Sequence, residues 1–440
     1  MNAEELVNLL RQGADRDYIG EPVSQLDHAL QAANAAKLAN SSESLIIASL
    51  LHDIGHFFSE EGQVQMPGLG TANHERLGAE SIRAAGFTEE IATLVEMHVD
   101  AKRYLVASNP DYREKLSAAS MATLELQGGV MTPHEAAAFE SHPLFEDILR
   151  VRAWDEAAKQ PGLEVPNERN YQAMMKRNLT NPISDTELSS WNQRGFLHIT
   201  GWFDEEEMSQ IRDVTDDIER WPEVSGKWMK YYEIDKDHKR KLCRIENFLQ
   251  NSPVFDSLCR STGTLNLMST LMEEPAELYK EKINFKLSGG QGFRAHQDAP
   301  AFSTFDQHFH ITLMLSIDTT NEENGCLEIA QGARLQELLE MNPDLTLHQD
   351  VIDSMAWAPI QTEPGDLVLF DSYLPHRSGP NQSRVSRRIL YATYNRKSEG
   401  NWRDAYFEAK RNRFPPDIER DPGRSYDPGV FNVGNPVKTD

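Results

Sequence analysis

The pattern of hydrophobic and polar residues changes near the middle of the chain. Up to about residue 180 the chain contains stretches rich in alanine and leucine, most clearly at residues 28–39 and 44–56. These residue types favour helices, and the second stretch is apolar enough to form a central, buried helix. We therefore predict that the first part of the chain is helical throughout.

From residue 278 onward the hydrophobic period shortens. Apolar side chains occupy every second position between residues 308 and 317, which is the pattern of a half-buried strand. Residues 325–330, 365–371 and 388–394 show a similar pattern, and each is bounded by Gly, Pro or Asn. The second part of the chain is therefore predicted to be mostly β.

A polar segment at residues 178–187 marks the predicted boundary between two domains, 1–180 and 181–440. Within it, Ser184 followed by Glu187 has the form of a capping box, so a short helix is expected to open the second domain. The end of the chain, from Phe414 onward, is rich in Pro, Gly and Asp and is expected to be an irregular tail.

Length and composition agree with two globular domains and narrow the range of partners. The chain has 440 residues, of which 39% are apolar, and a formal charge of −25. That charge repels phosphate backbones, which argues against nucleic acid but allows small anions where Arg and Lys cluster. The three cysteines form no close-spaced metal motif, and we find neither an N-terminal signal sequence nor a long apolar run. We expect a cytoplasmic protein without a membrane partner.

Histidine and aspartate residues are spaced through the helical half in a way that predicts a metal site. An adjacent His-Asp pair ends the apolar helix, and the other histidines lie at intervals of one helix plus a connection. The six candidate ligands are His28, His52, Asp53, His74, His98 and Asp155. One metal does not need four His and two Asp, whereas two metals bridged by Asp53 use all six.

These residues resemble the signature of the HD-domain family: a His, a later His-Asp pair and a final Asp. The segment 18–28 is most similar to the oxygenase branch of that family, the glycine-forming 2-amino-1-hydroxyethylphosphonate dioxygenases. The resemblance implies a mixed-valent di-iron centre at which Tyr18 occupies the open iron position and Glu21 recognises the substrate amine.

The same resemblance implies that Lys102, Ser120 and Arg152 bind the phosphonate. Elementary chemistry agrees, because a phosphonate dianion needs cations and hydrogen-bond donors beside the metals. His56, one turn after His52, is expected on the same helical face as a catalytic or substrate contact. Two other interpretations of this half stay open. It could be a phosphohydrolase that works with redox-inert metals, or a non-catalytic anion sensor that regulates the β half.

The β half contains a second predicted metal site. In His296-Gln-Asp298 the two outer side chains lie on the same side of an extended strand. His376, which follows the apolar segment 368–370, completes a set of two His and one carboxylate. Such a set holds iron(II) in non-haem oxygenases and leaves positions open for oxygen and a cosubstrate.

A basic residue follows the third ligand at a distance that suits a turn and a return strand. Arg387 lies eleven residues beyond His376, and its guanidinium can bind a dicarboxylate through two hydrogen bonds. Arg384 and Arg388 are rivals, but the first is expected in the turn and the second on the opposite face of the strand.

Together these features resemble the phytanoyl-CoA hydroxylase family of iron(II)/2-oxoglutarate dioxygenases, over about residues 190–405. The family pattern includes Lys286, the Gly-rich residues 289–292 and Arg387. The resemblance implies a double-stranded β-helix of the jelly-roll type with flanking helices, and it assigns Lys286 and Arg387 to 2-oxoglutarate. Within the family, residues 280–290 look most like the 2-aminoethylphosphonate dioxygenases.

The two resemblances combine into one expected activity. The β domain would hydroxylate 2-aminoethylphosphonate at C1 with mononuclear Fe(II), 2-oxoglutarate and O2, releasing succinate and carbon dioxide. The helical domain, with its Fe(II)/Fe(III) pair, would split the product, 2-amino-1-hydroxyethylphosphonate, into glycine and phosphate. An N-methylated aminoethylphosphonate is the alternative substrate, and the oligomeric state stays open.

Overall fold

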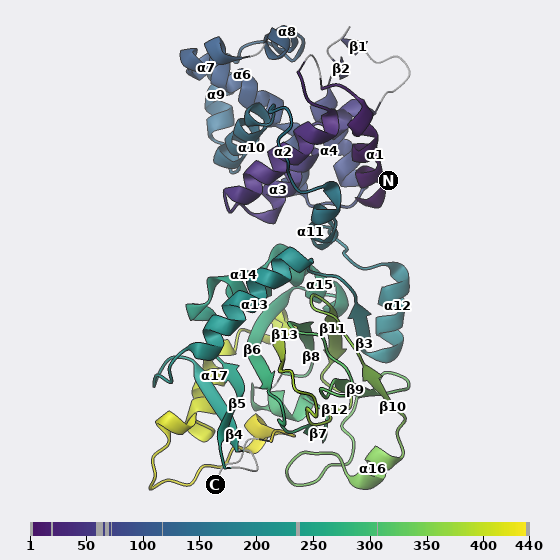
Figure 1. Ribbon diagram of the computed structural model, residues 1–440, viewed down its shortest axis with the longest axis vertical. Coiled ribbons are helices and arrows are strands. Elements are labelled where there is room, and N and C mark those ends of the chain that lie inside the picture. Colours follow the sequence, from purple (N-terminus) through teal and green to yellow (C-terminus); the bar gives the residue numbers. More distant parts are fainter. Residues whose placement is uncertain are drawn as a thin grey trace. The chain divides into compact units, whose positions relative to one another are not determined.

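The computed structural model describes residues 3–18, 21–58, 65–66, 70–71, 73–116, 118–234, 238–305 and 307–436. The chain divides into two compact units, Met1–Thr180 and Asn181–Asp440 (Figure 1). Within the described ranges, every helix is too short or too polar to cross a lipid bilayer.

The first unit is a bundle of helices joined by short 3-10 segments and loops. Its helices are α1 (Ala3–Gln12), α2 (Gln25–Leu38), α3 (Glu43–Leu51), α4 (His74–Ala84), α5 (Glu89–Glu96), α6 (His98–Ser108), α7 (Pro110–Lys115), α8 (Ala118–Leu126), α9 (Pro133–Glu140), α10 (Phe145–Ala157) and α11 (Gln172–Arg177), with η1 (Gly13–Asp15), η2 (Ile54–Phe57) and η3 (Glu168–Tyr171). A two-residue hairpin, β1 (Gln65–Met66) and β2 (Gly70–Thr71), departs from the prediction of helix throughout.

Helix α3 is the buried centre of this unit, as predicted. It begins after Ser42, whose hydroxyl accepts a hydrogen bond from the amide of Leu45, and every residue from Ser44 to Leu51 is buried. It packs against α2, α5 and α10. The helix ends at Leu51. His52 and Asp53 follow its C-terminus directly and therefore lie among the surrounding helices.

A close approach of two segments fixes the chain after α3. A Cβ atom on Gly55 would lie 1.8 Å from the carbonyl oxygen of His74 and 2.8 Å from the amide nitrogen of Gly78. Only a residue without a side chain lets η2 pack this tightly on the start of α4. The contact brings Asp53, two residues before the glycine, next to His74.

The second unit contains two antiparallel sheets with helices on the outside (Figure 1). Its strands are β3 (Phe196–Ile199), β4 (Met229–Ile234), β5 (Arg240–Glu246), β6 (Ala276–Lys286), β7 (Phe293–His296), β8 (His310–Ser316), β9 (Leu327–Ala330), β10 (Trp357–Ile360), β11 (Leu367–Asp371), β12 (His376–Ser378) and β13 (Arg387–Arg396). Its helices are α12 (Asp185–Arg194), α13 (Glu205–Arg220), α14 (Pro253–Arg260), α15 (Thr262–Met272), α16 (Gln349–Asp353) and α17 (Arg403–Arg413), with η4 (Leu249–Asn251), η5 (Ala299–Phe305), η6 (Lys397–Glu399), η7 (Asp417–Glu419) and η8 (Gly429–Asn432).

The strand order is that of a jelly-roll oxygenase fold. The larger sheet runs β3-β11-β8-β13-β6-β5-β4 and the smaller one β10-β9-β12-β7. Helices α13, α14 and α15 contribute to the main apolar core against the larger sheet, while a second cluster joins strands of both sheets. The predicted fold class is confirmed, and so is the capping box of Ser184 and Glu187 at the start of α12.

Strand β8 corrects one expectation. Its alternating pattern predicts a half-buried strand, but every residue from His310 to Ser316 is buried. The apolar side chains belong to the main core, whereas polar side chains of the other face are paired inside the fold: Thr312 lies 3.2 Å from Thr393 and Ser316 lies 2.5 Å from Thr362, oxygen to oxygen. A polar face satisfied by neighbouring strands has the same sequence pattern as a solvated face.

Candidate metal centres

The first unit brings all six predicted ligands to one place. They come from α2, the end of α3, the first residues of α4 and α6, and α10. One carboxylate oxygen of Asp53, Oδ2, lies 3.4 Å from His52 Nε2 and 3.7 Å from His28 Nε2. His28 Nε2 also lies 3.4 Å from Asp155 Oδ1. These four residues form one half of the cluster.

The other oxygen of Asp53 faces a second set of histidines. Asp53 Oδ1 lies 3.2 Å from His74 Nε2, 3.6 Å from His98 Nε2 and 3.8 Å from His56 Nε2. One carboxylate therefore stands between two groups of imidazole nitrogens, which is the arrangement that a bridging ligand requires. The ligand atoms fit two metal ions that share Asp53.

Backbone carbonyls orient three of the imidazoles. The Nδ1 atoms of His28, His52 and His98 lie 2.8, 2.7 and 2.6 Å from the carbonyl oxygens of Ala158, Ser49 and Val95. Each Nδ1 can donate its proton to a carbonyl, so Nε2 is left to bind a metal. Oδ1 of Asp155 is buried and has no hydrogen-bond partner, which also fits a site built for a cation.

The two carboxylates of the cluster stay ionised although they are buried. Burial raises the pKa of Asp53 and Asp155, but the surrounding His and Arg groups outweigh it and hold both well below the usual range. Burial lowers the pKa of His52, yet the charges of Asp53 and Asp155 outweigh that and raise it to about 9. A proton on His52 thus occupies the place that a metal charge would take.

Tyr18 and His56 border the two groups of ligands. The ring of Tyr18 stacks on His28, with centroids 3.7 Å apart, and the ring of His56 stacks on His74 at 4.0 Å. His56 lies on η2 and not on a continuation of α3, because the α-helix ends at Leu51. Burial and the charges of Asp53 and Asp155 raise the pKa of Tyr18 well above its usual value, so its hydroxyl keeps its proton when no metal is bound.

The predicted anion-binding residues are held by partners that the sequence did not reveal. Lys102 is buried and donates to Thr123 Oγ1 at 3.0 Å and to Gln127 Oε1, both on or just after α8, the helix that also carries Ser120. Burial lowers the pKa of Lys102 to about 7. A nearby anion would stabilise the charged form of this buried ammonium.

Arg152 and Glu21 belong to a chain of charges beside the metal cluster. Arg152 forms ion pairs with Asp155 and Glu156 and donates to the hydroxyl of Tyr112 at 2.9 Å. Lys159 Nζ lies 3.4 Å from Glu156 and 3.8 Å from Glu21. Arg152 and Glu21, which are predicted to bind opposite ends of the substrate, are therefore linked through Glu156 and Lys159.

The second unit assembles its three predicted ligands from two strands of the smaller sheet. His296 at the end of β7 pairs in register with His376 at the start of β12, and Asp298 follows two residues after His296. Their ligand atoms all lie within 4.8 Å of one another. The Nδ1 atoms of His296 and His376 lie 2.7 and 3.0 Å from the carbonyl oxygens of Arg294 and Leu374, which directs Nε2 toward the site.

The protonation states in this unit suit a metal. Burial and the charge of His376 lower the pKa of His296 to about 3, so its imidazole is neutral. Burial raises the pKa of Asp298, but the charges of His376, His296 and two lysines outweigh it and keep the carboxylate ionised. His296 with its neutral imidazole, the ionised Asp298 and the neighbouring His376 form the facial set of two histidines and one carboxylate that iron(II) oxygenases use.

Arg387 is a buried cation that forms no ion pair with the residues that the structure describes. Its Nε and Nη1 atoms are buried and have no hydrogen-bond partner, whereas Arg388 forms ion pairs with Asp318 and Asp216 on the other side of the strand. Arg384 is exposed. Of the three rivals, Arg387 is the one whose guanidinium is placed to receive a dicarboxylate.

Lys286 has a different arrangement from the one expected of a cosubstrate ligand. Its ammonium donates to Ser378 Oγ at 2.8 Å and to the carbonyl oxygens of Gly325 and Gly379 at 3.1 and 2.6 Å. All three of its hydrogens are used. It ties the turn before β9 to the end of β12, and its role toward 2-oxoglutarate stays a prediction.

The Gly-rich segment at residues 289–292 is packed and hydrogen-bonded. The amide of Gly289 donates to Asn381 and the amide of Asn381 donates back to Gly290, both at 2.9 Å. A Cβ atom on Gly292 would lie 2.3 Å from the carbonyl oxygen of Ser378. These glycines therefore allow close approach to the segment after His376.

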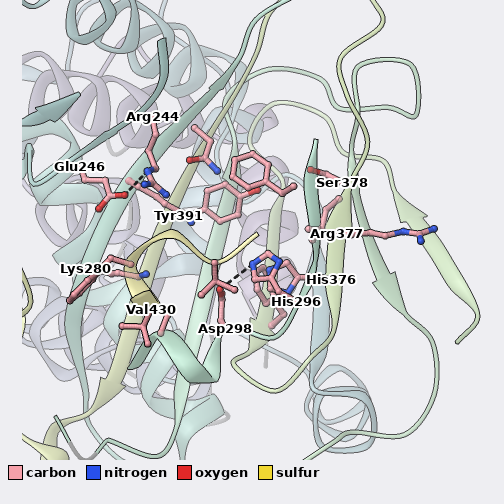
Figure 2. Close-up of a pocket in the computed structure, with 18 of the residues that line it drawn as sticks. Arg244, Glu246, Lys280, His296, Asp298, His376, Arg377, Ser378, Tyr391 and Val430 are labelled. Carbon is pink, nitrogen blue, oxygen red and sulfur yellow. Dashed lines mark ion pairs between the residues drawn. The ribbon is translucent and has the colours of Figure 1, made fainter. Parts of the chain in front are cut away.

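A pocket opens beside the three ligands of the second unit (Figure 2). Charged and polar side chains of β5, β6 and α17 form one wall, and His296, Asp298 and His376 face them across it. The irregular tail, expected only to wrap the domain, contributes Val430, Phe431 and Val433 to the lining. The carbonyl oxygen of Gly434 accepts a hydrogen bond from the amide of Arg294 at 3.0 Å, which holds the tail against β7.

Comparisons with known proteins divide the chain in the same two parts. The family model of the HD domain matches residues 26–127, and that of phytanoyl-CoA dioxygenase (PhyH) matches residues 191–389. Over 253 residues the chain is 46% identical to 2-aminoethylphosphonate dioxygenase of Uncultured bacterium HF130_AEPn_1, covering 57% of this chain and 97% of that protein.

Two other relatives match the first part of the chain. Over 163 residues it is 42% identical to [1-hydroxy-2-(trimethylamino)ethyl]phosphonate dioxygenase (glycine-betaine-forming) of Leisingera caerulea, covering 37% of this chain and 83% of that protein. It is equally identical to hydroxymethylphosphonate dioxygenase of Gimesia maris, with 37% and 81% covered. Each half of the chain thus matches separate proteins that are nearly as long as the matched segment.

Proposed function

This chain belongs to the phytanoyl-CoA dioxygenase family through its second unit and carries an HD domain in its first, and from this premise we propose that it carries out two consecutive oxygenations of an aminophosphonate. The second unit hydroxylates 2-aminoethylphosphonate at C1 while 2-oxoglutarate and O2 become succinate and carbon dioxide. The first unit then uses a second O2 to convert 2-amino-1-hydroxyethylphosphonate into glycine and phosphate.

The observation that carries this proposal is the pair of ligand sets on one chain. A carboxylate shared between two groups of histidines fits a di-iron pair, and two histidines with one carboxylate fit a single iron(II). Relatives that cover each set are named as phosphonate dioxygenases. The product proposed for the second unit has the hydroxyl group that the substrate of the first unit needs.

The residues of the chain bind and orient the reactants, while bound iron supplies the oxygen chemistry in both centres. In the second unit Arg387 binds a carboxylate of 2-oxoglutarate, and Lys286 holds the loops around His376 in place. In the first unit Lys102, Ser120 and Arg152 bind the phosphonate and Glu21 accepts the ammonium. Tyr18, stacked on His28, would hold its hydroxyl beside the metal ligands until the substrate binds.

The test is reconstitution of the full chain with iron under anaerobic conditions, followed by assays with a small set of phosphonates. We expect three irons per chain, and succinate, glycine and phosphate from 2-aminoethylphosphonate in the presence of 2-oxoglutarate and O2. Phosphate formed without oxygen consumption, or full activity of the first unit with zinc, would contradict the proposal and favour a phosphohydrolase.

The N-trimethylated analogue is the second candidate substrate. A relative of the first unit carries the trimethylamino group in its name, and the hydroxymethylphosphonate enzyme is equally similar. The same assays decide between them, because the preferred head group gives the highest kcat/KM for succinate formation in the second unit and for phosphate formation in the first.

We predict that Arg387→Ala weakens the binding of 2-oxoglutarate by about 2–5 kcal/mol, because truncation leaves a buried carboxylate without its partner. Arg384→Ala is the matched control, since that arginine is exposed three residues earlier. The measurement is the KM for 2-oxoglutarate during succinate formation. If Arg384→Ala raises this KM as much as Arg387→Ala does, Arg387 is not the cosubstrate ligand.

We also predict that Tyr18→Phe still cleaves supplied 2-amino-1-hydroxyethylphosphonate but loses activity faster in air without substrate. Phenylalanine keeps the ring stacked on His28 and removes only the hydroxyl that covers the metals. Glu21→Ala, in contrast, should bind the amine poorly and turn over slowly. Each variant is incubated aerobically, then given substrate, and phosphate release and the electron paramagnetic resonance signal are followed. A Tyr18→Phe protein as durable as the wild type would remove the protective role.

A further inference from the structure

The pocket of the second unit holds more positive charge than the metal ligands and the cosubstrate explain. Besides Arg377, which pairs with Glu328, four basic side chains line it: Arg244, Lys280, Lys282 and Lys410. The carboxylates that line it are Glu246 and Asp298, and Asp298 is a candidate metal ligand. Arg387, the candidate for 2-oxoglutarate, lies on β13 and is not one of these four.

The alternation of β6 explains why two lysines face the pocket together. Ile283 and Phe285 point to the apolar core under the helices, whereas Lys280, Lys282 and Asn284 line the pocket. Side chains two residues apart share one face of a strand. A sheet face that meets only solvent often carries lysines, but this face is turned toward the metal ligands inside the fold.

Ion pairs account for only part of this charge. Glu246 lies 2.6 Å from Arg244 Nε and 2.5 Å from Lys410 Nζ, and Figure 2 shows Arg244, Glu246 and Lys280 across the pocket from Asp298. Lys280 and Lys282 form no ion pair with a carboxylate in the part of the chain that the structure describes. Nη2 of Arg244 is buried without a hydrogen-bond partner.

The remaining neighbours of the two lysines are aromatic. Lys280 Nζ lies 4.7 Å from the ring centroid of Phe302 and 3.4 Å from the hydroxyl of Tyr406, and Lys282 Nζ lies 5.1 Å from the ring centroid of Tyr391. Burial, followed by the charge of Lys282, lowers the pKa of Lys280 to about 8. Lys280 and Lys282 repel one another, and Arg244 has a buried donor without a partner. An anion placed between these side chains would stabilise all three.

Resting on the proposed function, we propose that Lys280, Lys282 and Arg244 bind the phosphonate group of the substrate, and that Glu246 and Lys410 hold Arg244 in position. A phosphonate has three oxygens and carries up to two negative charges, which match three separate donors. A carboxylate has two oxygens and one charge and leaves at least one of these cations unpaired. The pocket therefore selects a phosphonate over a carboxylate of the same length and places it beside the metal ligands.

The first experiment measures succinate formation by the iron-loaded full chain as a function of substrate concentration. Lys282→Met should raise the KM for 2-aminoethylphosphonate about 10- to 100-fold, the effect of losing one charge-assisted hydrogen bond, and leave the KM for 2-oxoglutarate unchanged. Lys282→Arg should restore most of the loss. An unchanged KM for the phosphonate, or an equal rise in both KM values, overturns the subsite.

Arg377→Met is the matched control. Arg377 also carries a positive charge at this pocket, but Figure 2 shows its side chain pointing away, and it pairs with Glu328 at 2.8 Å. Its replacement should leave both KM values unchanged. If Arg377→Met raises the KM for 2-aminoethylphosphonate as much as Lys282→Met does, the effect comes from net charge, and the proposed contacts are wrong.

A second experiment separates the subsite from the reaction. Calorimetric titration of the full chain with methylphosphonate and with β-alanine compares the wild type with Lys282→Met, and the first unit is identical in both. We expect the wild type to bind additional methylphosphonate that Lys282→Met does not bind, and β-alanine not to compete for it. If this holds while 2-aminoethylphosphonate yields no succinate, the proposed function is wrong and the subsite stands. Equal binding of methylphosphonate by both proteins overturns the subsite.

Discussion

Asp298→Ala should abolish succinate formation from 2-aminoethylphosphonate, with a loss larger than about 100-fold. Changes outside the ligands of a metal already cost roughly 10- to 100-fold, and Asp298 is the carboxylate of the set formed with His296 and His376. Its removal also leaves Lys280 and Lys282 without the carboxylate whose ionised form they help to maintain. The measurement is succinate release by the iron-loaded variant.

The same variant should still release phosphate from supplied 2-amino-1-hydroxyethylphosphonate, because that reaction is assigned to the other unit. Asp256→Ala is the matched control, since this half-buried aspartate lies on α14 and pairs with Arg260 one helical turn away. If Asp298→Ala is folded and loses both reactions, the two units do not act independently. If it keeps succinate formation, the metal site lies elsewhere.

Asp53→Asn should abolish phosphate release from 2-amino-1-hydroxyethylphosphonate, again by more than about 100-fold, and reduce the iron content from three to one per chain. The substitution keeps the shape of the side chain but removes the charge and one of the two oxygens that face the two groups of histidines. Neither half of the cluster then has its shared carboxylate. Iron analysis and phosphate release measure the effect.

Succinate formation by Asp53→Asn should stay at the wild-type rate. Asp147→Asn is the control, because Asp147 lies on α10 eight residues before Asp155 and pairs with exposed Arg150. A variant that retains two irons in the first unit would show that Asp53 is not a bridging ligand. A variant that holds no iron in the first unit and still cleaves normally would overturn the di-iron assignment altogether.

Much of the fold could be predicted from local pattern. The buried helix at α3, the capping box at Ser184 and the strands β8, β9, β11 and β13 follow from periodicity and turn residues, which act over short distances in the chain. The two-residue hairpin of the first unit and the full burial of β8 could not be predicted. The burial of β8 depends on strands that are distant in sequence.

The candidate sites show the same division. Residue type and spacing were sufficient to propose the six ligands of the first unit and the three of the second, and the structure brings each set together. The expected function of Lys286 was less secure, because a lysine has three donors and only the fold decides where they point. Its partners belong to loops 39 to 93 residues away in the chain.

The sequence by itself determined which residues can do the chemistry: imidazoles and carboxylates for metals, and cations for anions. Only the tertiary structure decided which of these side chains face one another and which are already paired. The separate oxygens of Asp53 face different histidines because Gly55 lets η2 pack on α4. Arg387 and Arg388 leave the strand on opposite sides, and among the described residues only Arg388 meets carboxylates. Side-chain chemistry is encoded in single residues, whereas pairing and burial depend on contacts between segments that meet only when the chain folds.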